Sequence, residues 1–276
     1  MTHRSLSIGK LEPNRLRQLV FSCLGATDPH VIVGPKVGED AAVIDFQDKV
    51  IVVHSDPITG VIENVGKLAI NVCTNDIAAR GVRPQWILVV MLLPENFDLD
   101  QLEIVTKQMH KVAKELGVAI VGGHTEVTSS VSRPVIVTTA IGEAEKKGFV
   151  KTSGAEVGDR IIATKGAAIE GTAILSTEMD ELLSRKVGKS TIQRAKSFIN
   201  MTSVLEDALT AMEVGGVHAM HDATEGGIAG ALQEVAWASN VGIKVHEERI
   251  PIHKETGAIC KALNIDPLRT ISSGTL

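Results

Sequence analysis

The stretch "GKLAINVCTNDIAARGVRP", residues 66–84, has the apolar spacing of a helix followed by residues that terminate helices. It predicts a helix from about Asn64 to Arg80, because Gly81 directly after the helical run and a proline soon afterwards both favour termination. The following run "QWILVVMLL", 85–93, is apolar and lies between two prolines, which predicts a buried strand. A helix followed at once by a buried strand indicates a mixed α/β fold.

The same alternation of helix and strand extends on both sides of this stretch. The apolar spacing and the Gly and Pro signals predict two further helices, at 13–24 and 98–117, and four further strands, at 41–46, 50–55, 118–123 and 134–142. The helix at 98–117 has its apolar residues on one face, and Gly117 is expected to cap its C-terminus.

A second α/β unit is expected after a segment of weak periodicity and several glycines at 146–160. We therefore divide the chain into an N-terminal domain, 1–148, and a C-terminal domain, 149–276. The later pattern predicts helices across 170–213, with breaks near Gly188 and Thr202, and at 225–238 and 253–263. Strands are expected at 160–164, 217–220, 241–246 and from about Ile271.

Composition narrows the classes of function. The 276 residues are 44% hydrophobic, carry a net charge of −5, and include 3% aromatic residues with no Tyr. A basic, aromatic-bearing face for nucleic acid is therefore not expected, nor is a membrane-surface role. Neither a signal peptide nor an apolar run of membrane-spanning length is visible, so we expect a cytoplasmic protein.

The cysteines and histidines show no metal-binding spacing. Cys23, Cys73 and Cys260 are far apart and lack CxxC spacing, so each is expected to be a small buried hydrophobic residue. The histidines show neither HxH nor HExxH, which gives a transition-metal site little support.

Carboxylates recur at the predicted ends of strands and helices, among Gly, Thr, Asn or Ala. They are Asp40, Asp56, Asp76, Glu126 and Asp222. Carboxylates repel phosphates directly, but they hold Mg²⁺, which takes oxygen ligands and bridges to phosphate oxygens. We therefore predict magnesium ligation by Asp40, Asp56, Asp76 and Asp222.

Simpler interpretations of two motifs stay open. In "HDATEGG", 221–227, Asp222 or Thr224 is a good helix N-cap, and Glu225 suits a first helical turn. The stretch "GVIENVGKLA" approaches a P-loop, with Gly60, Gly66 and a candidate nucleotide-binding Lys67, but Leu68 replaces the required hydroxyl residue. With no GxGxxG either, a nucleotide enzyme of this sequence would use an acid-rich magnesium site.

The ordered motifs "GEDAAVI", "HSDPITG", "GKLAINVCTNDIAARGVRP", "VGGHTEV", "HDATEGGIAGALQEVA" and "SSGTL" resemble the AIR synthase-like (PurM-like) superfamily. It includes AIR synthase, thiamine-monophosphate kinase, selenophosphate synthetase and HypE. The resemblance implies an N-terminal domain that forms a barrel with a second subunit, and a C-terminal α/β domain behind it. ATP would bind at the dimer interface through magnesium.

The resemblance also implies roles for individual residues. Asp76 and Asp222 would be catalytic. The other matches, expected to bind ATP or its magnesium, are Asp40, Asp56, Asn75, Gly122, Gly123, Thr125, Thr224, Gly226 and Gly227.

Within the superfamily the motifs are most similar to HypE, which implies ATP-dependent activation of a carbamoyl oxygen and a carbamoyl-transferring or hydrogenase-maturation partner. Three features depart from that pattern. Glu225 stands where Arg is usual, His124 where Asp is common, and the chain stops at "ISSGTL", where further strands and a tail ending in Cys are expected. We therefore expect the C-terminal domain to be incomplete. The alternatives are a small-molecule kinase of the thiamine-monophosphate kinase type and a non-catalytic nucleotide-binding protein.

Overall fold

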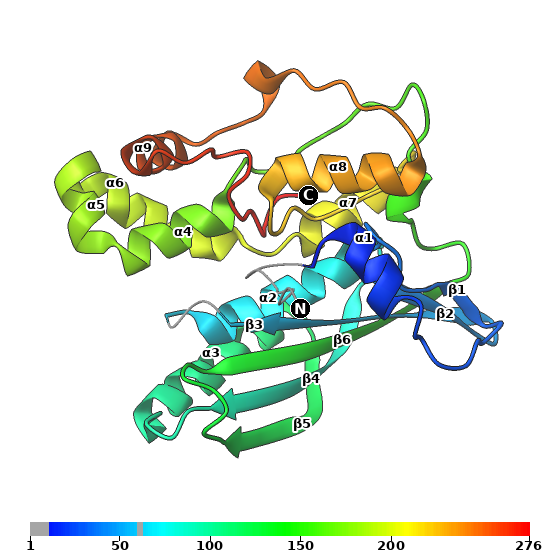
Figure 1. Cartoon of the computed structure of the whole chain (residues 1–276), viewed down its shortest axis with the longest axis horizontal. Coiled ribbons are helices and arrows are strands. Elements are labelled where there is room, and N and C mark those ends of the chain that lie inside the picture. Colours follow the sequence, from blue (N-terminus) through cyan, green and yellow to red (C-terminus); the bar gives the residue numbers. More distant parts are fainter. Residues whose placement is uncertain (1–10, 60–62) are drawn as a thin grey trace, which may run out of the picture.

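The computed structural model describes residues 11–59 and 63–276. Figure 1 shows two layers: a sheet with the helices α2 and α3 forms the lower one, and the remaining larger helices form the upper one. The mixed α/β fold is thus confirmed. Gly60, part of the stretch that approaches a P-loop, lies outside the described residues.

One six-stranded sheet has the order β1-β2-β3-β6-β4-β5. Its pairs are antiparallel except for β4 and β5, which run parallel and are joined by α3. The strands are β1 (Val31–Val33), β2 (Ala42–Phe46), β3 (Lys49–Ile58), β4 (Pro84–Leu93), β5 (Ala119–Val127) and β6 (Val135–Glu145).

The helices are distributed over both halves of the chain. The first half holds α1 (Pro13–Arg15), a π-helical turn (Leu16–Val20), α2 (Val65–Ala78) and α3 (Leu99–Leu116). The second half holds α4 (Ile169–Glu178), α5 (Asp180–Val187), α6 (Lys189–Lys196), α7 (Leu205–Val214), α8 (Gly227–Ser239) and α9 (Lys254–Leu263). Short 3-10 turns lie at Thr152–Gly154, Ser197–Met201 and Glu247–Arg249.

Helix α2, which contains the opening stretch, is the buried centre of the molecule. Nearly all of its residues are buried, because it packs against β3 and β6 on one side and contacts α7 on the other. At its end Gly81 has φ 74°, and a Cβ there would lie 2.7 Å from the Met212 side chain of α7. Glycine is required at this turn both for its backbone conformation and for the close approach of α7.

The elements predicted for the first half are confirmed, with small shifts of boundary. Helix α3 begins with a capping box between Asp98 and Gln101 and ends at Gly117, which has φ 72° as expected for a glycine C-cap. The N-terminal helix is shorter than predicted, and β1 was not predicted from its three apolar residues.

The strands expected in the second half do not form among the described residues. The helices there are confirmed, including the breaks near Gly188 and Thr202, but the segments expected to be strands are irregular. Isolated backbone hydrogen bonds connect these segments, and no strand ladder forms among the described residues. Examples are Thr164 N–H to Leu276 O and Ala223 N–H to Thr275 O. Alternating apolar residues favour an extended chain, but a strand also needs a neighbour that continues the hydrogen bonding.

No described helix combines the length and the apolar character needed to cross a bilayer.

Candidate active site between the two layers

Strand β3 and helix α2 bring His54, Asp56 and Asp76 together. His54 and Asp56 are two residues apart on β3 and therefore share a face of the strand, the one that α2 covers. Asp76, in the last turns of α2, completes the group, and one ligand atom of each residue lies within 4.8 Å of the others. Two of the predicted magnesium ligands are thus adjacent, with a histidine beside them.

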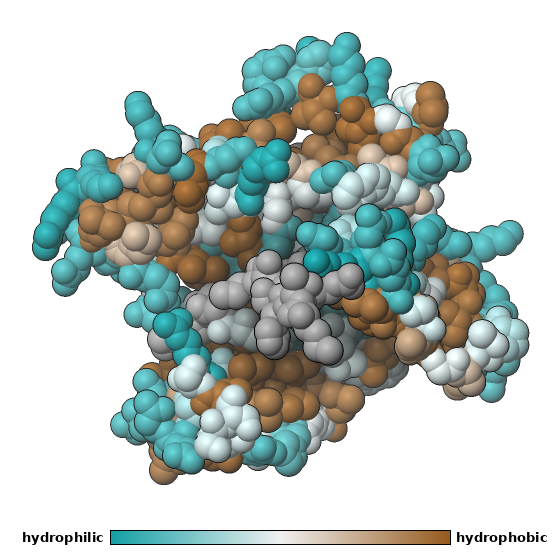
Figure 2. Space-filling model, in the orientation of Figure 1, coloured by the Kyte–Doolittle hydropathy of each residue, from teal (hydrophilic) through white to brown (hydrophobic). Residues whose placement is uncertain are grey.

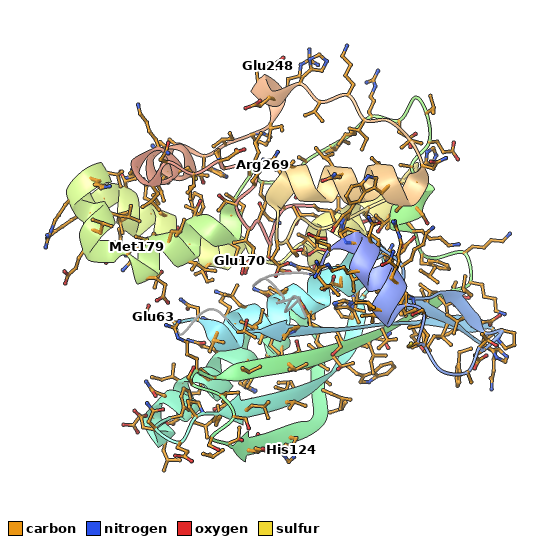
Figure 3. The ribbon with its side chains drawn as sticks, viewed as in Figure 1. Glu63, His124, Glu170, Met179, Glu248 and Arg269 are labelled. Carbon is orange, nitrogen blue, oxygen red and sulfur yellow. The ribbon has the colours of Figure 1, made fainter. Side chains whose placement is uncertain are left out.

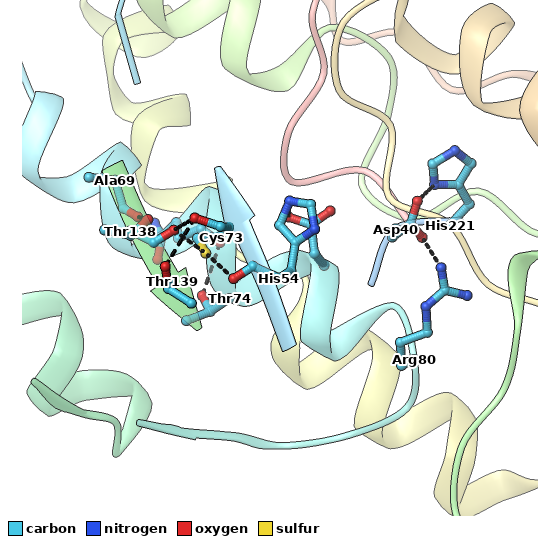
Figure 4. Close-up of polar contacts among 12 residues, drawn as sticks. Asp40, His54, Ala69, Cys73, Thr74, Arg80, Thr138, Thr139 and His221 are labelled. Carbon is cyan, nitrogen blue, oxygen red and sulfur yellow. Dashed lines mark hydrogen bonds and ion pairs between the residues drawn. The ribbon is translucent and has the colours of Figure 1, made fainter. Parts of the chain in front are cut away.

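A second group joins the two halves of the chain. Asp40 precedes β2, whereas His221 and Asp222 precede α8, and their ligand atoms also lie within 4.8 Å of one another. His221 Nδ1 lies 2.7 Å from Asp40 Oδ1 (Figure 4), and its Nε2 lies 2.7 Å from Glu234 Oε2. The imidazole therefore bridges a carboxylate of each layer.

Arg80 supports this second group from below. Its side chain is fully buried, with Nη2 3.5 Å from Asp40 Oδ2 (Figure 4) and Nη1 3.0 Å from Glu39 Oε2. A buried guanidinium must be paired, since an isolated ion in a protein interior costs several kcal/mol. Glu39, the residue next to the predicted ligand Asp40, therefore has a structural partner.

Burial and neighbouring charges oppose each other at these groups. Burial would raise the pKa of Asp40, but the charges of His221 and Arg80 and the His221 contact lower it overall. Burial would lower the pKa of His221, but Asp40 and Glu234 raise it to about 10. Asp40 is therefore ionised and His221 carries a proton on both nitrogens at neutral pH.

A pocket of about 280 Å³ borders both groups, and Asp40, His54 and the cationic Lys36 are among its lining residues. Asp40 and His54 thus face a common space large enough for part of a nucleotide.

Two other candidate residues of α2 contact the second half of the chain. The Asn75 side chain donates from Nδ2 to Thr202 O at 2.8 Å and accepts at Oδ1 from Val204 N–H at 2.9 Å. Lys67 donates to Asn200 Oδ1, and burial lowers its pKa. In this structure both side chains join the layers, and their nucleotide contacts stay predictions.

The segment at 122–125, expected to be a glycine-rich turn, is part of a strand and is not brought to the acids within one chain. Gly122, Gly123 and Thr125 lie on β5, the outer strand of the sheet, three strand spacings or about 14 Å from β3. Glu126, also on β5, is exposed, and its Oε2 lies 3.0 Å from Nε2 of His124 (Figure 3). The sequence did not reveal this separation, because it depends on the order of the strands.

The helix-cap interpretation of "HDATEGG" is wrong. Helix α8 begins at Gly227 with Gly226 as its N-cap, and no side chain caps it. Asp222 is instead 1% exposed and belongs to the second group. A Cβ on Gly227 would lie 2.6 Å from Leu268 O and Thr270 O, so this glycine allows the C-terminal segment to pass close by.

Three site residues were missed by the sequence analysis. His221 and Arg80 carry the buried ion pairs, and Glu170, in the first turn of α4, is 3% exposed. Figure 3 places Glu170 between the layers. Burial, followed by the charges of Glu225 and Asp56, raises its pKa to about 7, although Ser273 opposes the shift. Two of them stand beside signals that the sequence analysis used: His221 begins the motif "HDATEGG", and Arg80 precedes the helix-ending glycine.

The prediction that all three cysteines are buried is wrong for one of them. Cys73 and Cys260 are buried, and burial raises the pKa of both thiols, that of Cys73 to about 12. Cys23 is exposed, because the N-terminal helix ends before it. The two buried thiols are thus poor nucleophiles.

Family models match both halves of the chain. The AIR synthase related protein N-terminal domain matches residues 38–144, and the corresponding C-terminal domain matches 156–276. The chain belongs to the AIR synthase related protein family. Within this family, a hydrogenase expression/formation protein of Methanocaldococcus jannaschii is 31% identical over 271 residues, which cover 96% of this chain and 78% of that protein.

Other relatives in the family are carbamoyl dehydratases. HypE of Rhizobium leguminosarum bv. viciae is 30% identical over 218 residues, which are 77% of this chain but only 59% of that enzyme. Among solved structures, a HypE–HypF complex has a TM-score of 0.73 at 28% identity and covers 86% of this chain and 76% of that one. HypE in complex with ATP has a TM-score of 0.69 at 26% identity, covering 98% and 78%.

Proposed function

We propose that this member of the AIR synthase related protein family uses ATP to activate the oxygen of a carbamoyl or similar primary amide group. The observation that carries the proposal is the pocket that Asp40 and His54 both line, because Asp40 belongs to the group with Asp222 and His54 to the group with Asp56 and Asp76. The similarity to HypE bound to ATP and to carbamoyl dehydratases supports it.

The carboxylates fit a divalent cation bound together with nucleotide phosphates. Asp56 and Asp76, whose oxygens lie together, would hold magnesium, and Asp222, which lies with Asp40, would be a ligand at the second group. The ion supplies charge neutralisation for the transferred phosphoryl group. Asp40, held by His221 and Arg80, would shape the site and repel misplaced phosphates.

The proposed reaction balances as a dehydration driven by ATP. The carbamoyl oxygen attacks the γ-phosphorus and ADP leaves. Loss of both N–H protons and of phosphate then converts S–C(=O)–NH₂ into S–C≡N. The carbamoyl oxygen ends in inorganic phosphate. Because Cys73 and Cys260 are buried, the thiol that presents the carbamoyl group would be the exposed Cys23 or one of a separate protein, such as a maturation partner.

Product analysis tests this function directly. The chain is incubated with Mg-ATP and a peptide ending in S-carbamoylcysteine labelled with ¹⁸O in its carbonyl. We expect the peptide to lose one water and the phosphate to gain the label. Asp76→Asn should reduce the rate more than tenfold, a loss of about 1.4 kcal/mol, whereas Asp45→Asn, which removes an exposed pair with Lys146, serves as the matched control.

The alternatives predict different products. A phosphorylated product from thiamine monophosphate would establish the kinase, and nucleotide binding without any product would establish a non-catalytic protein. Either result, with the peptide unchanged, would overturn the dehydratase proposal.

We also propose a homodimer through the open face of the sheet. Trp86 and Leu88 of β4 are more than a third exposed there, beside Ile141 of β6. Figure 2 shows apolar surface over this part of the sheet, and such a patch is typical of an interface. Every residue of the outer strand β5 is also exposed.

Light scattering at micromolar concentration should therefore give the mass of two chains. Trp86→Glu should shift the protein towards monomer, because it places a charge in the apolar face. Trp237→Glu, at an exposed position on α8, is the control and should stay dimeric. A monomeric parent protein would refute the dimer.

A further inference from the structure

His54 adds a nitrogen donor to a site that the sequence predicted from carboxylates alone. Its Nε2 lies 3.5 Å from Asp76 Oδ2, and Asp56 completes a group of one nitrogen and two carboxylate donors. We propose that His54, Asp56 and Asp76 form a site for a divalent transition ion such as Mn²⁺, with His54 Nε2 as a ligand. The proposal rests on the proposed function only in placing a metal at this site.

The spacing of the donor atoms suits a shared ion. A separation of 3.5 Å between Nε2 and Oδ2 is long for a hydrogen bond. Two ligands that each lie about 2.1 Å from one ion, at octahedral or tetrahedral angles, are about 3.0–3.5 Å apart. The side chain of His54 is 26% exposed and that of Asp76 is 11% exposed, so an ion can reach the group from the pocket side.

The other histidine of the site cannot serve in this way. Both ring nitrogens of His221 lie 2.7 Å from carboxylate oxygens, of Asp40 and of Glu234. These two contacts occupy both ring nitrogens, so neither is open to a metal in this structure. The nitrogen-containing metal site is therefore on β3 and α2, and the group around Asp40 is held by protein cations.

The surroundings of Asp56 also favour a cation. Glu170 is 3% exposed, and within the described part of the chain its Oε2 has no hydrogen-bond partner. Burial, followed by the charges of Glu225 and Asp56, raises its pKa. A buried carboxylate oxygen in a field set by two other carboxylates is destabilised, and a divalent cation bound at Asp56 would relieve this.

The donor set decides the class of metal. Mg²⁺ prefers oxygen ligands and retains several waters, whereas an imidazole nitrogen favours first-row transition ions. His54 is therefore expected to shift selectivity from Mg²⁺ towards Mn²⁺, with the phosphates of a nucleotide completing the coordination.

Binding of Mn²⁺ to the full chain, without nucleotide, is measured by electron paramagnetic resonance, with Mg²⁺ as competitor. Pulsed spectra should show the ¹⁴N coupling of a bound imidazole. In His54→Ala this coupling should vanish and the ratio of Mn²⁺ to Mg²⁺ affinity should fall at least tenfold. His246→Ala, which removes an exposed histidine beside Glu248, should change neither quantity.

Bound Mn²⁺ without ¹⁴N coupling, or an affinity ratio that His54→Ala leaves unchanged, would overturn the proposal, as would failure of the parent chain to bind Mn²⁺. His54→Gln, which keeps a polar side chain of similar length, repeats the test if the alanine variant does not fold. The measurement of Mn²⁺ binding needs neither ATP nor turnover, so its outcome is independent of the dehydratase test. A chain that binds Mn²⁺ through His54 but leaves the carbamoyl peptide unchanged would refute the proposed function alone.

Discussion

Replacing Arg80 with methionine should lower the free energy of unfolding by about 3–5 kcal/mol. The guanidinium is fully buried and lies within 3.0 Å of Glu39 and 3.5 Å of Asp40. Methionine fills much of the same volume but leaves both carboxylates without this cation. His221 would still neutralise Asp40, so most of the cost arises at Glu39, whose side chain is 3% exposed.

Urea denaturation near neutral pH measures this loss. Arg83→Met is the matched control, because Arg83 is half-exposed and lies 3.8 Å from the exposed Glu206. An exposed pair contributes about 0–1 kcal/mol, so this variant should differ little from the parent. If Arg80→Met costs no more than Arg83→Met, the buried network does not stabilise the fold. The double change Glu39→Gln with Arg80→Met should recover part of the loss, since no charge stays unpaired at that position.

Replacing Glu170 with glutamine should change the free energy of unfolding in a pH-dependent way. Relative to the parent chain, the variant should be more stable at pH 8 than it is at pH 5. Burial and the charges of Glu225 and Asp56 raise the pKa of Glu170 from 4.5 to about 7. The folded state therefore binds this proton more tightly than the unfolded state. The resulting stability is fully present below pH 4.5 and is lost as the pH rises through about 7.

Glutamine cannot ionise, so the Glu170→Gln variant does not lose stability in this way as the pH rises. The stability difference between variant and parent should rise by about 2–3 kcal/mol from pH 5 to pH 8, at about 1.4 kcal/mol per pKa unit. The measurement is urea denaturation with a chelator present, because a cation at Asp56 would lower the pKa of Glu170. Glu181→Gln, at an exposed pair with Arg185, is the control. A difference independent of pH would show that Glu170 does not titrate in this range.

Local signals predicted the first half of the fold well. The capping box and Gly117 define α3, and the apolar run between prolines defines β4, because each signal acts within a few residues. The prediction of strands in the second half was wrong for a different reason. An extended segment becomes a strand only beside another, and 160–164 and 241–246 have no ladder partner among the described residues.

The sequence by itself determined the family and the order of helices and strands in the first half, and it predicted which acids would hold a cation. Asp40, Asp56, Asp76 and Asp222 were recognisable because acids among small residues at element ends have a local signature. Only the tertiary structure decided how they are grouped: Asp56 and Asp76 with His54, but Asp40 with His221 and Arg80. The physical reason is that electrostatic pairing acts through space. Strand order and the contact between layers set the distances between charges, and sequence spacing does not record them.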